Sequence, residues 1–95
     1  MSEELTLDGG TVLGFPPHVK FRFDERRQAW IVLAPERLFL PDEQAVAILR
    51  LIDGARSVDQ VIDALAGEFD APRGEIAGDV LAMLRDLLAK HVLAR

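Results

Sequence analysis

The residue types that could do chemistry are few in this sequence, and their spacing does not assemble a site. The two histidines, His18 and His91, stand near opposite ends of the folded region, and no His-Glu-x-x-His or comparable ligand spacing occurs. There is no cysteine, which excludes a thiolate nucleophile, a disulfide and a cysteine-ligated metal. Ser57 is explained as a helix cap. We therefore expect no catalytic residue, no metal and no cofactor.

Acid–base chemistry would have to come from the carboxylates, and these have simpler roles. Asp42 and Glu43 fall at the start of a predicted helix, where negative charge is stabilised by roughly 0.3–1 kcal/mol. The carboxylates expected on solvent-facing helix surfaces include Asp59, Asp63, Asp79 and Asp86. A paired acid–base site needs two carboxylates in unlike environments within a pocket. The pattern indicates no such pair, so we do not expect an enzyme.

The composition describes one small folded domain. The chain has 95 residues, of which 49% are hydrophobic, and its formal net charge is −5. No apolar run approaches the roughly 20 residues that span a bilayer. The first residues have neither the basic start nor the apolar stretch of a signal peptide, so we expect a cytoplasmic protein. The negative charge disfavours a nucleic-acid partner.

The elements that must position any site begin after an N-terminal segment. Residues 1–17 are predicted to be a flexible tail because glycine and proline recur there, and residues 18–95 are predicted to form the domain. Apolar and basic residues alternate over 18–23, which is typical of a strand with one solvent-facing side. Residues 29–34 are apolar on both faces, and 37–40 form a short third strand. We predict a three-stranded antiparallel meander.

From Asp42 the apolar spacing becomes helical. The first helix is predicted to end near Gly54, placed as the left-handed residue that follows a helix. Ser57 and Gln60 form a capping box that begins the second helix. Pro72 suits the first turn of a third helix that runs to about Lys90, and residues 91–93 add an extended piece. The expected fold class is α+β, a three-stranded sheet followed by a three-helix bundle, with a winged-helix-like helix–turn–helix corner.

That corner raises the possibility of DNA binding, which the charges do not favour. The second helix would read the DNA, and its outward positions carry no lysine or arginine. They are Asp59, Gln60, Asp63, Gly67 and Glu68. A reader of duplex DNA needs a cationic surface and base-reading side chains. A degenerate winged-helix regulator therefore remains only an alternative.

The third strand is the more informative element. Because the chain leaves it for a helix, it is expected to lie at the edge of the sheet, where backbone N–H and C=O groups lack a partner. Residues 37–40 carry three apolar side chains and one charge, Arg37. An extended peptide could add there as a fourth strand. The alternative is that Leu38 and Leu40 face the core and the tail covers Phe39. Pro41 has no N–H, so pairing must stop there.

A combination of motifs resembles the PqqD family, small proteins of pyrroloquinoline quinone biosynthesis. The motifs are Trp30–Arg37 with its Pro-Glu turn, Asp42–Leu49, Ile52-Asp53-Gly54 and Ser57-Val58. They follow the family's order and spacing, and the resemblance extends from about His18 to Leu93. The family commonly has an apolar residue and asparagine where this chain has Pro41 and Asp42.

The resemblance implies a peptide chaperone without chemistry or cofactor of its own, a recognition element for ribosomally made, modified peptides. Such a protein binds the precursor peptide PqqA and presents it to the radical SAM enzyme PqqE, which joins a glutamate to a tyrosine in that peptide. In related domains the leader peptide pairs with strand three beside helix three. The corresponding strand residues here are Arg37, Leu38, Phe39 and Leu40, and the candidates on the helix are Ile76, Val80, Met83 and Leu87.

A third possibility is a small dimerisation module. The open strand could pair with the same strand of a second copy, or the glycine-rich tail could exchange between copies to give a homodimer.

Overall fold

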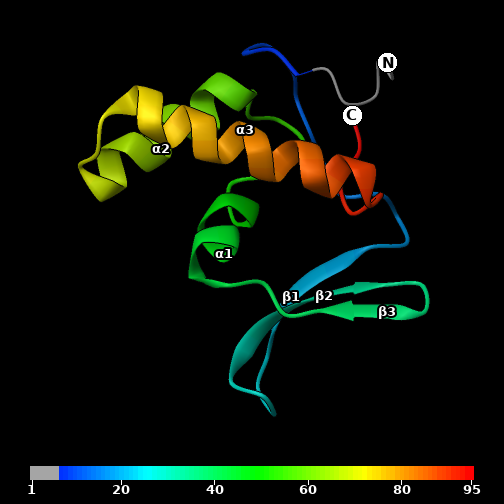
Figure 1. Ribbon diagram of the computed structural model, residues 1–95. Helices are drawn as coiled ribbons and strands as arrows, with labels where there is room; N and C mark the ends of the chain where they lie inside the picture. Colours follow the sequence, from blue (N-terminus) through cyan, green and yellow to red (C-terminus); the bar gives the residue numbers. More distant parts are fainter. Residues whose placement is uncertain (1–6) are drawn as a thin grey trace.

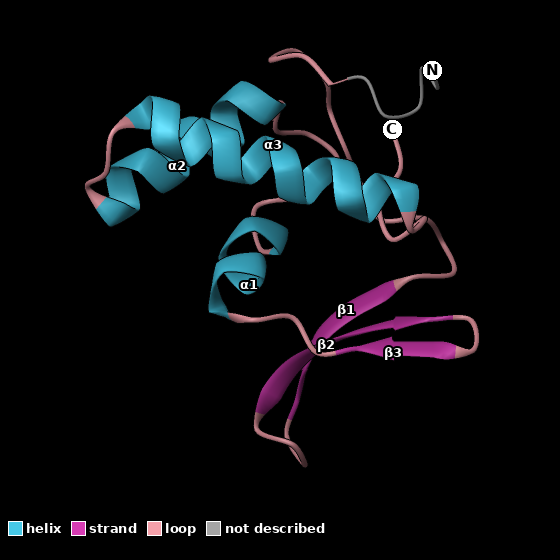
Figure 2. Ribbon diagram, in the orientation of Figure 1, coloured by secondary structure: helices cyan, strands magenta, loops and turns pink. Residues whose placement is uncertain are grey.

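The computed structural model describes residues 7–95, and in that part of the chain three strands precede three helices (Figures 1 and 2). The strands are β1 (Lys20–Asp24), β2 (Ala29–Ala34) and β3 (Arg37–Phe39). The helices are α1 (Glu43–Leu49), α2 (Val58–Phe69) and α3 (Arg73–Ala89). The α+β class and the antiparallel meander are confirmed, although the third strand ends one residue before the predicted Leu40.

The sheet has the order β1-β2-β3, so β2 lies in the centre. This explains why residues 29–34 are apolar on both faces: Ile31 and Val32 are both buried. Phe21 and Phe39 are both in register with Val32 and therefore lie on the same face of the sheet. All three belong to or pack against the core formed with the helices.

The first helix begins as predicted but is shorter. The Asp42 carboxylate accepts a hydrogen bond from the amide of Ala45 at 2.8 Å and caps α1. Arg50 is already the C-terminal cap residue, so Gly54 does not follow the helix directly. Gly54 is left-handed, with φ 77°, but lies in the turn before α2, where its N–H donates to the Leu13 carbonyl. The predicted end of the first helix at Gly54 is therefore wrong.

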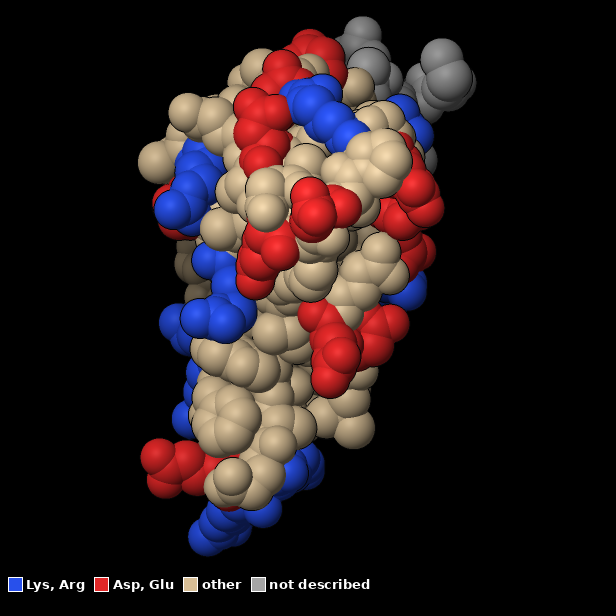
Figure 3. All heavy atoms as spheres, turned by 90° about the vertical axis from the view of Figure 1, so that its left-hand side faces the viewer, with Lys and Arg blue, Asp and Glu red and all other residues tan. Residues whose placement is uncertain are grey.

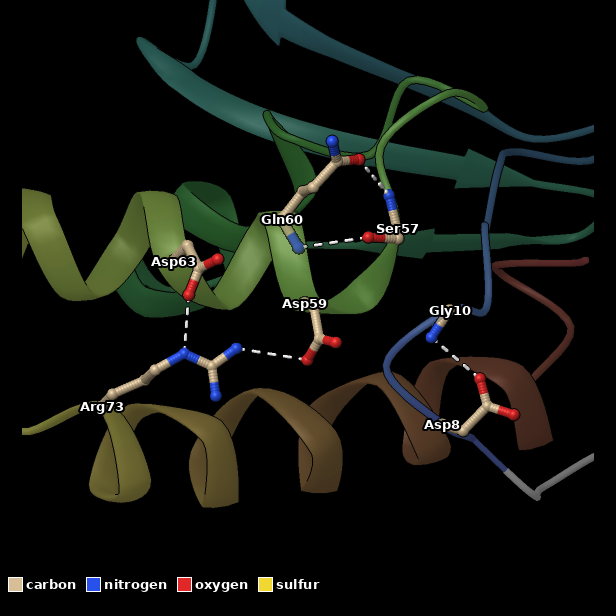
Figure 4. A network of polar contacts seen from close by, with 7 residues as sticks. All are labelled: Asp8, Gly10, Ser57, Asp59, Gln60, Asp63 and Arg73. Atoms are coloured by element: carbon tan, nitrogen blue, oxygen red, sulfur yellow. Dashed lines mark hydrogen bonds and ion pairs between the residues drawn. The ribbon is translucent and has the colours of Figure 1, made fainter.

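The second and third helices follow the prediction closely. The amide of Gln60 donates to Ser57 Oγ, and the amide of Ser57 donates to Gln60 Oε1, which completes the capping box (Figure 4). α2 ends at Asp70 in a left-handed conformation, and Pro72 precedes α3. α3 packs on α2, with Leu84 fully buried in the core.

Part of the segment expected to be a tail contacts the helices. The Thr11 carbonyl accepts a hydrogen bond from Val58 N at 2.8 Å, at the start of α2. Gly14 and Ala94 exchange two backbone hydrogen bonds, 2.8 and 2.9 Å long. Leu13, between these contacts, is only 2% exposed. Backbone hydrogen bonds thus fix residues 11–14 against the domain, and Leu13 contributes to the core, which the sequence pattern did not indicate. Residues 1–6 of the expected tail lie outside the described residues.

Within residues 7–95 no helix is both long enough and apolar enough to pass through a lipid bilayer.

Candidate functional site

The third strand is open along one side. β2 is the one strand paired with β3 in the described part of the chain, and no backbone bridge involves the other edge of β3 there. Leu38 in this strand is 41% exposed, and Leu40 just beyond it is 64% exposed. Soluble proteins usually protect such an edge with charge or a cover. In the described part of the chain no backbone segment covers this edge.

The turn before β3 indicates which backbone groups point outward. Pro35 at the second position and Glu36 with φ 61° at the third are the features of a type II turn, in which the fourth residue typically donates to the first. The amide of Arg37 is then directed toward Ala34, its partner on β2. Because bonding alternates along an antiparallel strand, we expect the N–H and C=O of Leu38 to face the open side.

An apolar groove of about 260 Å³ lies between β3 and the C-terminal half of α3. Phe39 and Leu40 form its strand side, and Met83 and Leu87 form its helix side. Its remaining lining residues are Val32, Pro41, Asp42, Ala45, Leu49, Asp86, Lys90 and Val92. The groove can accept apolar side chains of a segment that lies along β3.

Three charged side chains at the groove, those of Arg37, Asp86 and Lys90, have partners within the protein. Arg37 Nη2 donates to the Lys90 carbonyl at 3.2 Å, and its guanidinium carbon lies 5.4 Å from the Phe39 ring centre. Lys90 Nζ lies 2.9 Å from Asp86 Oδ2. A cation at the C-terminal end of α3 is favoured by the helix dipole. Arg37 therefore joins the start of β3 to the end of α3 and leaves a largely apolar surface for a ligand.

Of the eight residues predicted for the site, four line this groove and two more belong to its strand without lining it. Phe39, Leu40, Met83 and Leu87 line the groove, and the other two, Arg37 and Leu38, lie on its strand.

Ile76 and Val80 lie elsewhere. They line a second hollow toward the other end of α3, and Val80 is buried in the core. The wall of the groove therefore uses only the part of α3 from Met83 onward. The site residues predicted from the sequence did not include Asp86 and Lys90, which also line the groove. They follow Met83 by three and seven residues, and this spacing places them on the same face of the helix.

The polar side chains of the described residues have structural roles where their contacts can be followed. Within the described residues, no group of three side chains that could ligate a metal comes together. The pKa of the Asp24 carboxyl is lowered mainly by the hydrogen bond from the Arg27 side chain, and that of Asp53 by the hydrogen bond from the Arg56 amide. Both carboxylates hold turns, so their shifted pKa values have a structural cause.

The fold and groove define a small winged-helix-like α+β domain with an open strand beside an apolar groove. A comparison with family models matches residues 29–93 to coenzyme PQQ synthesis protein D. The chain belongs to the PqqD family.

Two curated relatives show how far the similarity extends. The "PqqA binding protein" of Rhodopseudomonas palustris strain BisB5 is 51% identical over 92 residues, covering 97% of this chain and 90% of the relative. The "Bifunctional coenzyme PQQ synthesis protein C/D" of Methylorubrum extorquens is 42% identical, covering 99% of this chain but 25% of the relative. In that organism a domain similar to this one is fused to another synthesis protein.

Two solved structures share the fold. One is the solution NMR structure of the PqqD truncation of Methylobacterium extorquens PqqCD, described as a functional, stand-alone recognition element for ribosomally synthesized and post-translationally modified peptides. It matches with a TM-score of 0.81 and 41% identity over 99% of this chain and 100% of that one. The crystal structure of PqqD from Xanthomonas campestris matches with a TM-score of 0.57 and 32% identity over 92% of this chain and 97% of that one.

Proposed function

We propose that this protein binds a PqqA precursor peptide as a fourth strand beside β3. The observation that carries the proposal is the unpaired edge of β3 next to an apolar groove. Further support comes from relatives that are named for PqqA binding and from the similar domain described as a peptide recognition element. The proposed ligand is thus a peptide.

The geometry supports a division of roles between backbone and side chains. The Leu38 N–H and C=O would form the ladder to the peptide, which supplies affinity without reading sequence. Alternate peptide side chains would enter the groove between Leu40 and Leu87, where apolar burial contributes about 25 cal/mol per Å². Pairing would end at Pro41, which lacks an N–H.

The proposed role is that of a carrier, not an enzyme. The peptide would be presented to the radical SAM enzyme PqqE, and this domain would supply no catalytic group and no cofactor. In one relative a similar domain is fused to another PQQ synthesis protein, which supports a role in which this domain acts together with biosynthetic enzymes.

An amide NMR titration of the full chain with PqqA tests the site. We expect the largest saturable shifts at Leu38, Leu40 and Leu87, and slowed hydrogen exchange of the Leu38 amide as its N–H gains a partner. Strand addition would be contradicted if the chemical shift changes were confined to residues outside β3 and the C-terminal half of α3.

The open strand also supports a second candidate, a homodimer in which β3 pairs with β3 of another copy. Light scattering with and without PqqA separates the two proposals. Dimers that dissociate as the peptide binds indicate competition for the same edge, whereas a monomer at all concentrations rejects this dimer.

The DNA-binding alternative receives no support from the charges of α2. The residues predicted to face outward, Asp59, Gln60, Asp63, Gly67 and Glu68, are all exposed, and none is basic. A gel-shift assay at low salt with duplex DNA would overturn this view if it detected sequence-dependent binding.

A further inference from the structure

A second hollow, of about 300 Å³, opens between α1, α2 and the N-terminal half of α3. Its apolar lining includes Ala47, Leu65, Phe69 and Ile76. Phe69 is 53% exposed, and burying such a ring completely is favourable by about 1.5–3 kcal/mol. The hollow therefore offers apolar surface that the protein itself does not cover.

Two carboxylates that form no ion pair within residues 7–95 line this hollow, and two more are close to it in sequence. Glu43 and Asp79 line the hollow, and Asp70 and Glu75 are the sequence neighbours of Phe69 and Ile76. Among the described residues these four carboxylates form no ion pair. The described carboxylates that do are Asp24, Asp53, Asp59, Asp63 and Asp86. Figure 3 shows acidic side chains beside tan surface on the side of the molecule that is at the left in Figure 1, with lysine and arginine side chains also present there.

The nearest arginine in sequence does not neutralise this rim. Arg73 Nε lies 2.6 Å from Asp63 Oδ1, and Arg73 Nη2 lies 3.1 Å from Asp59 Oδ1 (Figure 4). Both hydrogen bonds raise the pKa of Arg73 and commit its guanidinium to α2. Arg73 therefore forms no ion pair with the carboxylates that line the hollow.

We propose that this hollow is a docking site for a second protein, which inserts one bulky apolar side chain flanked by lysine or arginine. The apolar lining suits the inserted side chain, and the carboxylates of Glu43 and Asp79 attract the flanking cations and orient their approach. An anionic segment meets like charge at the same place.

The hollow and the peptide groove can be occupied together. No residue lines both, because the groove uses α3 from Met83 onward and the hollow uses Ile76, Asp79 and Val80. The docking partner therefore need not displace a peptide bound at β3. The proposal does not depend on the identity of the ligand in the groove.

The test uses the full ¹⁵N-labelled chain and a synthetic probe, an end-capped hexapeptide of sequence Lys-Lys-Leu-Phe-Lys-Lys. We expect saturable amide shifts at Ala47, Phe69 and Ile76 that weaken at least threefold when ionic strength is raised from 50 to 500 mM, the screening range of about 14 to 4 Å. The double variant Glu43→Gln/Asp79→Asn should weaken the probe's binding at least threefold and leave PqqA affinity unchanged.

The matched control is the hexapeptide with glutamate in place of every lysine, which should give no shifts at the hollow. The proposal is overturned if both peptides bind equally, if the shifts fall only at the groove, or if the basic probe gives none. Shifts at the hollow that appear on concentrating the protein alone would also overturn it, because a second copy would then be the occupant. PqqA titrations of the same variants report on the groove separately.

Discussion

Replacing Leu40 by serine isolates the contribution of the groove to peptide binding. Leu40 lines the groove and is 64% exposed, so the folded protein depends little on its side chain. We expect the free energy of unfolding to change by less than about 0.5 kcal/mol. A loss of PqqA affinity in this variant would then report a lost contact with the peptide, because the protein remains folded.

The size of the effect follows from the surface that a peptide would still cover. Burying a whole leucine side chain is favourable by about 1.5–3 kcal/mol, and 64% of Leu40 remains to be buried. The loss should therefore be about 1–2 kcal/mol, which raises the Kd for PqqA about 5- to 30-fold.

Isothermal titration calorimetry of PqqA into both proteins measures this change, with the thermal unfolding midpoint as the check on folding. Phe69→Ser is the matched control, because Phe69 is similarly exposed but lies in the second hollow. An unchanged Kd in folded Leu40→Ser, or an equal loss in the Phe69 variant, would refute the placement of the peptide in the groove.

Three further predictions concern the backbone, the N-terminal segment and pH. Leu38→Pro removes one outward N–H and should weaken PqqA binding by about 0.5–1.5 kcal/mol or more in calorimetry; an unaltered affinity would exclude ladder pairing there. Leu13→Ala should lower the free energy of unfolding by about 2–5 kcal/mol in urea denaturation because Leu13 is buried. Val12→Ala is the control and should change this free energy little, because Val12 is exposed. An equal change in both variants would contradict the packing of Leu13 in the core. The Arg56 amide lowers the pKa of Asp53 in the folded state, so its stabilisation is present above the ordinary carboxyl pKa and is lost as pH falls through the lowered value. Urea unfolding from pH 6 to 2 should show a weaker pH dependence in Asp53→Asn than in the parent, and identical curves would contradict this linkage.

Local patterns account for the elements that were predicted well. The capping box of Ser57 and Gln60 involves residues three apart, so its hydrogen bonds form wherever the helix starts. The alternation in β1 and the Pro-Glu turn before β3 are equally local. The early end of α1 was missed because Leu51 and Ile52 continue the apolar spacing although their amides donate to carbonyls three residues back.

The sequence by itself determined that this chain has a three-stranded meander followed by three helices, and that its third strand is short and apolar, because turn, cap and periodicity signals depend on neighbouring residues. Only the tertiary structure decided which residues meet. Leu13 joins the core because backbone hydrogen bonds hold Thr11 to Val58 and Gly14 to Ala94, and α3 turns Met83 toward β3 but Val80 into the core. Such contacts depend on how elements distant in sequence are oriented, and helical spacing alone does not specify which part of a helix faces a given strand.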